Sequence, residues 1–91
     1  MSKVTKEFID NLLNEVVVKT TAWYAPTPHV IAVAWLGTFQ LGTAISKAVD
    51  PANFNEELGI EYSTKDAGKI AENKLWELEG YHLYKTLKGD K

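Results

Sequence analysis

Residues 5–16 carry the spacing of an amphipathic helix. Thr5 is a favoured N-cap residue, and Glu7 places an acid where the helix dipole stabilises it. Apolar residues then recur every three or four positions, at Phe8, Ile9, Leu12, Leu13 and Val16. Because the run 16–18 consists of three β-branched valines, which disfavour further helix, we predict that the helix fades there.

Residues 20–46 change to the pattern of β-strands. Residues 20–24 are rich in β formers and predict a short first strand, after which Pro26-Thr27-Pro28 forces a corner. Two β-prone runs, 29–36 and 39–46, then flank Gly37-Thr38. A two-residue loop with Gly at its first central position suits a type II′ turn, so we predict a β-hairpin over residues 29–46.

The predicted hairpin register gives two apolar faces. The first, a candidate for the core, pairs Leu36 with Phe39, Ala34 with Leu41, Ala32 with Thr43 and Val30 with Ile45. The second places His29, Ile31, Val33 and Trp35 opposite Ser46, Ala44, Gly42 and Gln40. Because a wet sheet face should be polar, we expect a helix layer, another subunit or a ligand to cover the second face.

Of these three covers, we predict another subunit. We therefore predict a homo-oligomer, a dimer or higher, whose interface contains Ile31, Val33, Trp35 and Gly42. Gly42 beneath the Trp35 ring would permit close approach by a ring or by another backbone. A ligand trough and simple burial under the last helix are the two alternatives for this pair.

The remaining residues predict two helices. Asp50-Pro51 is a strong helix start, and Gly59 is a natural stop, so the first of these helices is short. The last helix starts at Ser63 or Thr64, is interrupted by Gly80, and packs on the sheet through Trp76 and nearby apolar residues. The predicted fold class is therefore α+β: an N-terminal helix, a small antiparallel sheet, then a short and a long C-terminal helix packed on it.

Composition narrows the classes of protein. The 91 residues, 45% of them hydrophobic, predict a single domain over residues 1–91. Net charge is −2 and there is no Arg, which argues against duplex nucleic acid as a partner. The absence of Cys removes disulfides, zinc–thiolate sites and thiol nucleophiles. The longest apolar stretch, residues 30–36, is too short to cross a bilayer, and the first residues lack a signal-peptide core.

The sequence offers little for catalysis or metal binding. His29 and His82 are its only histidines, in the hairpin and in the last helix. No nucleophile elbow, zinc-protease motif or Gly-rich phosphate loop is present. We therefore predict a protein that is not an enzyme and that needs no cofactor or metal.

An aromatic pair on a proline-stiffened loop is the most suggestive constellation for binding. Trp23 and Tyr24 can stack on a flat ring such as a base. Thr27, His29 and Lys19 can bond sugar or phosphate, so these five residues form the predicted ligand site. The alternative is structural: Trp23 and Tyr24 alternate across a strand, with one in the core and one at its rim.

From Trp35 onward the chain contains a Gly-containing hairpin turn, Gly42, and three later blocks: Val49-Asp50-Pro51-Ala52-Asn53-Phe54, Leu58-Gly59 and Lys74-Leu75-Trp76-Glu77-Leu78-Glu79-Gly80-Tyr81. In these features it resembles a family of small tailed-phage proteins named for gene products 49 and 66 of two podophages. The chain departs from the family pattern in its Gly-Thr turn and in a longer stretch between Gly59 and Trp76.

The resemblance implies a phage accessory protein that acts in the cytoplasm of the infected bacterium. It supplies no mechanism, but small non-structural phage proteins often counter host defence. We therefore predict that the protein sequesters a host small-molecule nucleotide signal in aromatic pockets at subunit junctions. The alternative is a protein–protein inhibitor that docks an apolar, Trp-rich surface on a host enzyme.

Overall fold

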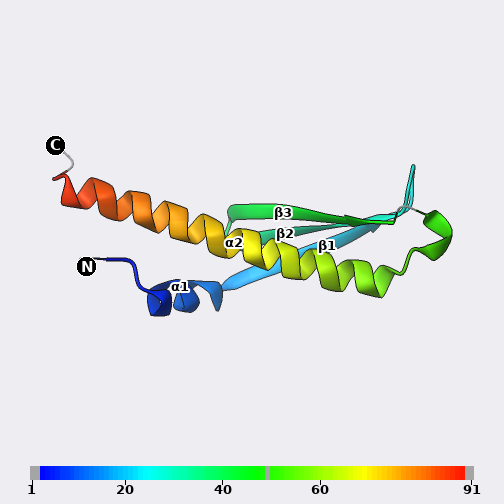
Figure 1. The fold of residues 1–91 in the computed structure, drawn as a ribbon, viewed down its shortest axis with the longest axis horizontal. Helices are drawn as coiled ribbons and strands as arrows, with labels where there is room; N and C mark the ends of the chain where they lie inside the picture. Colours follow the sequence, from blue (N-terminus) through cyan, green and yellow to red (C-terminus); the bar gives the residue numbers. More distant parts are fainter. Residues whose placement is uncertain (1–2, 49, 90–91) are drawn as a thin grey trace.

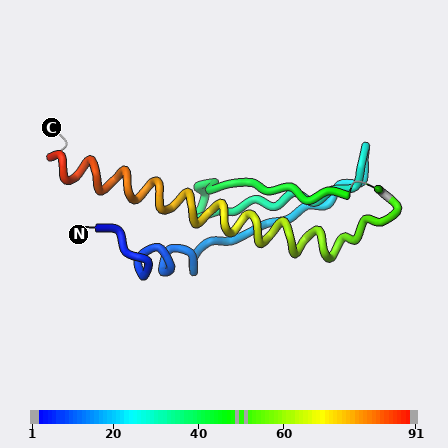
Figure 2. Tube along the Cα trace, in the orientation of Figure 1, coloured from blue at the N-terminus to red at the C-terminus, as the bar shows by residue number. Residues whose placement is uncertain are grey.

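The computed structural model describes residues 3–48 and 50–89 and has an α+β fold (Figure 1). Its elements are α1 (Lys6–Leu13), β1 (Val16–Trp23), β2 (His29–Leu36), β3 (Phe39–Lys47), a single 3₁₀ turn η1 (Pro51–Asn53) and α2 (Glu56–Leu87). The strands form one antiparallel sheet in the order β1-β2-β3. Helix α2 runs along one face of this sheet and continues past the strand ends, next to α1 (Figures 1 and 2). The α+β class, the small antiparallel sheet and the long C-terminal helix are as predicted.

The N-terminal helix α1 forms within residues 5–16, where the apolar spacing predicted it. The Thr5 side chain accepts a hydrogen bond from the Phe8 backbone N–H at 3.1 Å, which caps α1. Ile9 is fully buried and anchors α1 to the core. The helix ends at Leu13, and Val16 already begins β1. The first strand is thus eight residues long, because the valine run belongs to the sheet and not to a fading helix.

The hairpin turn is confirmed, but its register changes along β3. Gly37 has a φ of 63°, in the left-handed region that a primed turn requires. Leu36 pairs with Phe39 and Trp35 with Gln40, as predicted; then a β-bulge intervenes, and Ala34 pairs with Gly42. The predicted pairing of Ala34 with Leu41 is therefore wrong. A bulge adds one residue to a strand, which moves all later side chains of β3 to the opposite face.

This shift fits β3 to the helix above it. Leu41 and Ala44 are buried, whereas Thr43 and Ile45, predicted to face the core, are exposed. Gly42 now lies under α2, where a Cβ atom would overlap Cγ2 of Ile70. The bulge therefore allows α2 to lie close to the sheet, since strict alternation would have placed Thr43 in the core.

The two predicted C-terminal helices are one. Asp50 accepts a hydrogen bond from the Ala52 N–H at 3.0 Å, but the turn it starts is only η1. Asn55 caps α2 by accepting from the Leu58 N–H at 3.1 Å. The helix then runs through Gly59 and Ser63, so a stop at Gly59 and a new start at Ser63 are both wrong.

Helix α2 continues through Gly59 and Ser63 because of the way these residues pack. A Cβ at Gly59 would come within 2.9 Å of Val30 Cγ2, so Gly59 serves close contact with β2. The buried Ser63 hydroxyl donates to the Gly59 carbonyl at 2.7 Å, within the helix. The buried side of α2 is a row spaced by four residues, most of them small: Gly59, Ser63, Ala67, Ala71 and Leu75.

The aromatic segment that follows Leu75 does not pack on the sheet. Trp76, Leu78 and Tyr81 are 36%, 39% and 62% exposed, so the prediction that Trp76 and its neighbours hold the last helix on the sheet is wrong. The reason is one of length. A helix of 32 residues spans about 48 Å, whereas strands of eight or nine residues span about 30 Å. The end of α2 therefore lies beyond the sheet.

Candidate functional site

The face of the sheet opposite α2 carries the candidate site, and we call it the open face. Among residues 3–48 and 50–89, no helix lies on this face, because both α1 and α2 pack on the other side with the core. Strand pairing arranges the open face in four cross-strand rows: Trp23, His29 and Lys47; Thr21, Ile31 and Ile45; Lys19, Val33 and Thr43; Val17, Trp35 and Gln40. The rows combine aromatic, aliphatic and cationic groups on one surface.

The open face has no carboxylate. All twelve acidic residues of the chain lie outside residues 16–49, whereas the open face holds Lys19, Lys47 and His29. Helix α2 on the opposite side holds seven acidic residues and four lysines, Lys65, Lys69, Lys74 and Lys85, so it is net acidic. The open face is thus the cationic side of a chain whose net charge is −2. This distribution favours an anion at the open face.

The first row brings together an aromatic ring, an imidazole and an ammonium group. Trp23 is the Cα partner of His29, and His29 is the partner of Lys47. The Trp23 side chain is 54% exposed. His29 Nδ1 lies 2.7 Å from the Thr27 carbonyl oxygen. Because a carbonyl only accepts, Nδ1 carries the hydrogen, and Nε2 is the nitrogen left for a ligand.

Sequence reasoning missed Lys47. The predicted register placed Ser46 opposite His29, and the bulge at Leu41 replaces it with Lys47. The signal that pointed to this was the sequence of β3 itself. Gly42 and Ala44 are small enough to lie under a helix, whereas Thr43 and Ile45 are typical of an outer sheet face.

The predicted ligand-site residues separate into two groups. Lys19, Trp23 and His29 share the open face. Tyr24 lies toward the start of α2, where its hydroxyl donates to the Glu56 carboxylate. Its ring forms a T-shaped pair with the Phe54 ring, with the two ring centroids 6.2 Å apart. Thr27 takes part through its backbone carbonyl, which hydrogen-bonds with His29, and not through its side-chain hydroxyl.

The predicted interface residues also divide. Ile31, Val33 and Trp35 are half-buried and lie on the open face. Gly42 lies on the opposite side of β3, beneath Ile70 of α2, so its assignment to the Trp35 face is wrong. The physical cause is again the bulge, which turns Gly42 inward.

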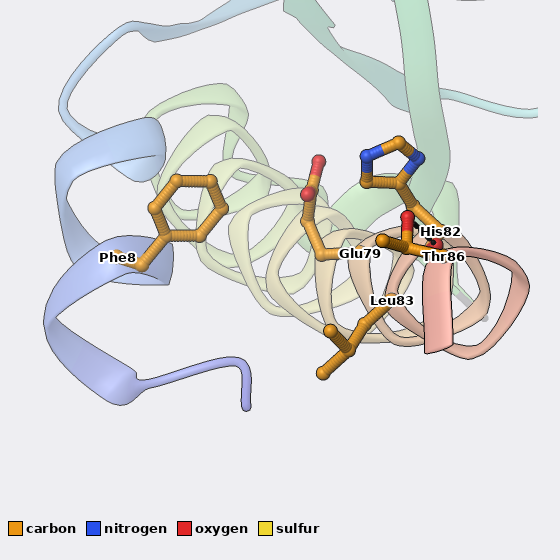
Figure 3. Close-up of a pocket in the computed structure, with 5 residues that line it drawn as sticks. All are labelled: Phe8, Glu79, His82, Leu83 and Thr86. Atoms are coloured by element: carbon orange, nitrogen blue, oxygen red, sulfur yellow. Dashed lines mark hydrogen bonds between the residues drawn. The ribbon is translucent and has the colours of Figure 1, made fainter. Parts of the chain in front are cut away.

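Three cavities lie outside the centre of the open face. One of about 220 Å³ lies between α1 and the end of α2, lined by Phe8, Glu79, His82, Leu83 and Thr86 (Figure 3). Its Thr86 hydroxyl donates to the His82 carbonyl at 3.0 Å and is already engaged. The others, of about 190 and 390 Å³, lie at the start of α2 and between β3 and α2. Of the first-row residues, Lys47 lines one of these three cavities. Because no described helix covers this side of the sheet, the first row is a shallow surface.

Within residues 3–48 and 50–89, no three His, Asp or Glu side chains are grouped so as to hold a metal ion. No helix in this part of the chain is both long enough and apolar enough to span a bilayer.

The protruding end of α2 is a second exposed surface. Tyr81 and Tyr84 stack at 6.3 Å, and the ammonium groups of Lys85 and Lys88 each lie 5.8 Å from one of these rings. Gly80 lies in this segment without breaking the helix, at a cost of about 1 kcal/mol relative to Ala.

Comparison with known proteins gives one match. No curated protein and no solved structure matches the chain. The profile of one family matches residues 4–87, which is nearly the whole chain and includes the helices, all three strands and the open face. The chain therefore belongs to the phage protein (N4 Gp49/phage Sf6 gene 66) family.

Proposed function

We propose that this phage protein sequesters a nucleotide-type anion in the cytoplasm of the infected bacterium, without catalysis, and thereby blunts a host defence signal. The observation that carries the proposal is the row Trp23–His29–Lys47 on a sheet face that lacks carboxylates. An exposed indole stacks on a base, a contribution of about 1–3 kcal/mol. Lys47 and the Nε2 of His29 are suited to phosphate oxygens.

Self-association would deepen this shallow surface into a pocket. Five of the nine residues in the other three rows are apolar: Ile31, Ile45, Val33, Val17 and Trp35. Ile45 is 59% and Val17 48% exposed, which is costly for a lone sheet in water. A second copy packed on these rows would bury them and leave the first row at the rim, where a wall of the partner would enclose a ligand.

The alternative is an inhibitor that docks on a host enzyme. The shallowness of the first row in the single chain favours it, because protein partners bind flat apolar patches with aromatic anchors. In that case Trp23 and Trp35 are the anchors, and the same apolar rows contact the host protein.

Nucleotide binding is tested by titration of the intrinsic fluorescence with ADP and cyclic di-AMP. We expect quenching of the exposed Trp23, and a loss of affinity of about tenfold or more for Trp23→Ala, since about 1.4 kcal/mol corresponds to a factor of ten. Lys47→Gln should weaken binding less than Trp23→Ala does. Its effect should be larger at low salt than at high salt, because salt screens the charge.

The matched control is Phe39→Ala. Phe39 is 56% exposed and lies in the same sheet, at the opposite end from Trp23. The affinity for adenosine, which has no phosphate, reports the stacking contribution. The affinity for inorganic pyrophosphate, which has no base, reports the charge contribution. Equal affinity of the wild type, Trp23→Ala and Phe39→Ala proteins for every probe would contradict the proposed site.

Self-association through the open face is tested with Trp35→Glu. A carboxylate in this apolar row would be buried without a partner if a second copy covers it, so the variant should dissociate at this interface. Its helical circular dichroism should persist, because the Trp35 side of β2 does not contact α2. An unchanged mass by light scattering would refute this interface.

A further inference from the structure

The protruding end of α2 carries an apolar strip that no described element covers. Figure 2 shows this segment extending beyond the strands, with α1 along one of its sides. The side toward α1 is the one that lines the cavity of Figure 3, through Glu79, His82, Leu83 and Thr86. Next to it, residues at helical spacing align Trp76, Gly80, Tyr84 and Leu87. Tyr84 and Leu87 are 56% and 67% exposed.

Gly80 is the centre of this strip. The helix is continuous through it, and a Cβ built there would meet no atom within 4 Å. The chain itself therefore gains no contact from the missing side chain. Two helices approach each other most closely where the residue at their crossing is small, because the side chains at the contact set the distance between the axes.

We infer that α2 crosses α2 of a second copy at Gly80, in antiparallel orientation. A two-fold axis at Gly80 places each residue that follows it opposite the one equally far before it. Tyr84 then lies opposite Trp76 of the partner helix, and Leu87 opposite Asn73. The Tyr84–Trp76 pair therefore forms twice across the axis, as an isologous interface requires.

The charges of α2 support the antiparallel orientation. Lys88 follows Gly80 by eight residues and Glu72 precedes it by eight, and each lies about 80° around the helix from Gly80. An antiparallel crossing therefore places Lys88 of each helix opposite Glu72 of the other. A parallel pair would place lysines beside lysines and acids beside acids.

This contact is separate from the open face, since α2 packs on the opposite side of the sheet. If both surfaces self-associate, the chain has two different isologous interfaces. Such a chain assembles from dimers through two alternating contacts, and breaking either interface leaves dimers. The inference goes beyond the proposed function, because the crossing at Gly80 stands whether or not the open face binds a nucleotide.

Single-cysteine variants test the crossing directly, because the chain has no cysteine of its own. A residue on a two-fold axis lies next to its own copy, within the Cα separation of about 4.4–6.8 Å that a disulfide spans. Gly80→Cys should therefore form a covalent dimer rapidly under mild oxidation. Gly68→Cys is the control, since Gly68 also lies within α2 and a Cβ there also meets no atom within 4 Å. Equal crosslinking of the two variants would overturn the inference.

Gly80→Gln gives an independent readout. Gln is a better helix former than Gly and has room in the single chain, but it would clash with its own copy at the crossing. We expect the mass by light scattering to fall while helical circular dichroism is kept, and Gly68→Gln to keep the wild-type mass. A Gly80→Gln protein of unchanged mass would overturn the crossing. Covalent dimers of Gly80→Cys that persist in a Trp35→Glu background would separate this contact from the open face.

Discussion

Leu75→Ala should lower the free energy of unfolding by about 2–5 kcal/mol, the range for truncating a buried leucine. Leu75 is 2% exposed and ends the buried row of α2, where it packs with Ile9 of α1 and with the core residues of the sheet. Its removal leaves a cavity at the point where α1, α2 and the sheet meet. For a domain of this size, about 1 kcal/mol moves the thermal midpoint by roughly 4–8 °C. Urea and thermal unfolding would measure the change.

Leu78→Ala is the matched control. It removes the same atoms from the same helix three residues later, at a position that is 39% exposed. We expect a loss of less than about 1 kcal/mol, since this side chain is already partly exposed to water in the folded state. Equal losses for the two variants would mean that the end of α2 packs differently from the structure described above.

Gly42→Ala should destabilise the fold by about 1–3 kcal/mol, as expected for overpacking. Alanine normally stabilises a strand relative to glycine, so the expected sign is opposite to the usual one. The reason is that a Cβ at position 42 would overlap Cγ2 of Ile70, and the β-branched Ile70 has essentially one rotamer in a helix. Denaturant unfolding of the single variants and of the double variant measures this.

The double variant Gly42→Ala, Ile70→Ala isolates the clash. Removing Cγ2 of Ile70 should recover about 0.5–3 kcal/mol of the loss, the size of coupling typical of residues in contact. Gly68→Ala is the control for the backbone effect, because a Cβ meets no atom there and helix propensity should raise stability by up to about 1 kcal/mol. Additive effects of Gly42→Ala and Ile70→Ala would show that α2 does not lie over Gly42.

The elements with local signals were predictable. The cap at Thr5 and the Gly37 turn depend on neighbouring residues, so the sequence contains the whole cause of each. The β2 face also followed from alternation: Val30, Ala32 and Ala34 are fully buried. The family followed from sequence blocks, and the profile match over residues 4–87 confirms it.

The errors came from residues whose role is set by distant contacts. Gly59 resembles a helix stop and Ser63 a helix start, yet both lie inside α2 because small side chains let it lie against the sheet. The bulge at Leu41 places Gly42 under α2, and the alternation of small and β-branched residues over 42–45 signals it only once a helix is known to cover that side of β3. The same bulge brings Lys47 opposite His29, so this part of the candidate site required the tertiary structure.

Native mass spectrometry of protein purified gently from phage-infected cells tests the central claim most directly. We predict an added mass of a nucleotide-sized ligand per copy or per pair of copies, released on denaturation and absent from the Trp23→Ala protein. An assembly without any small-molecule adduct, accompanied by a stoichiometric host protein, would contradict sequestration and favour the inhibitor.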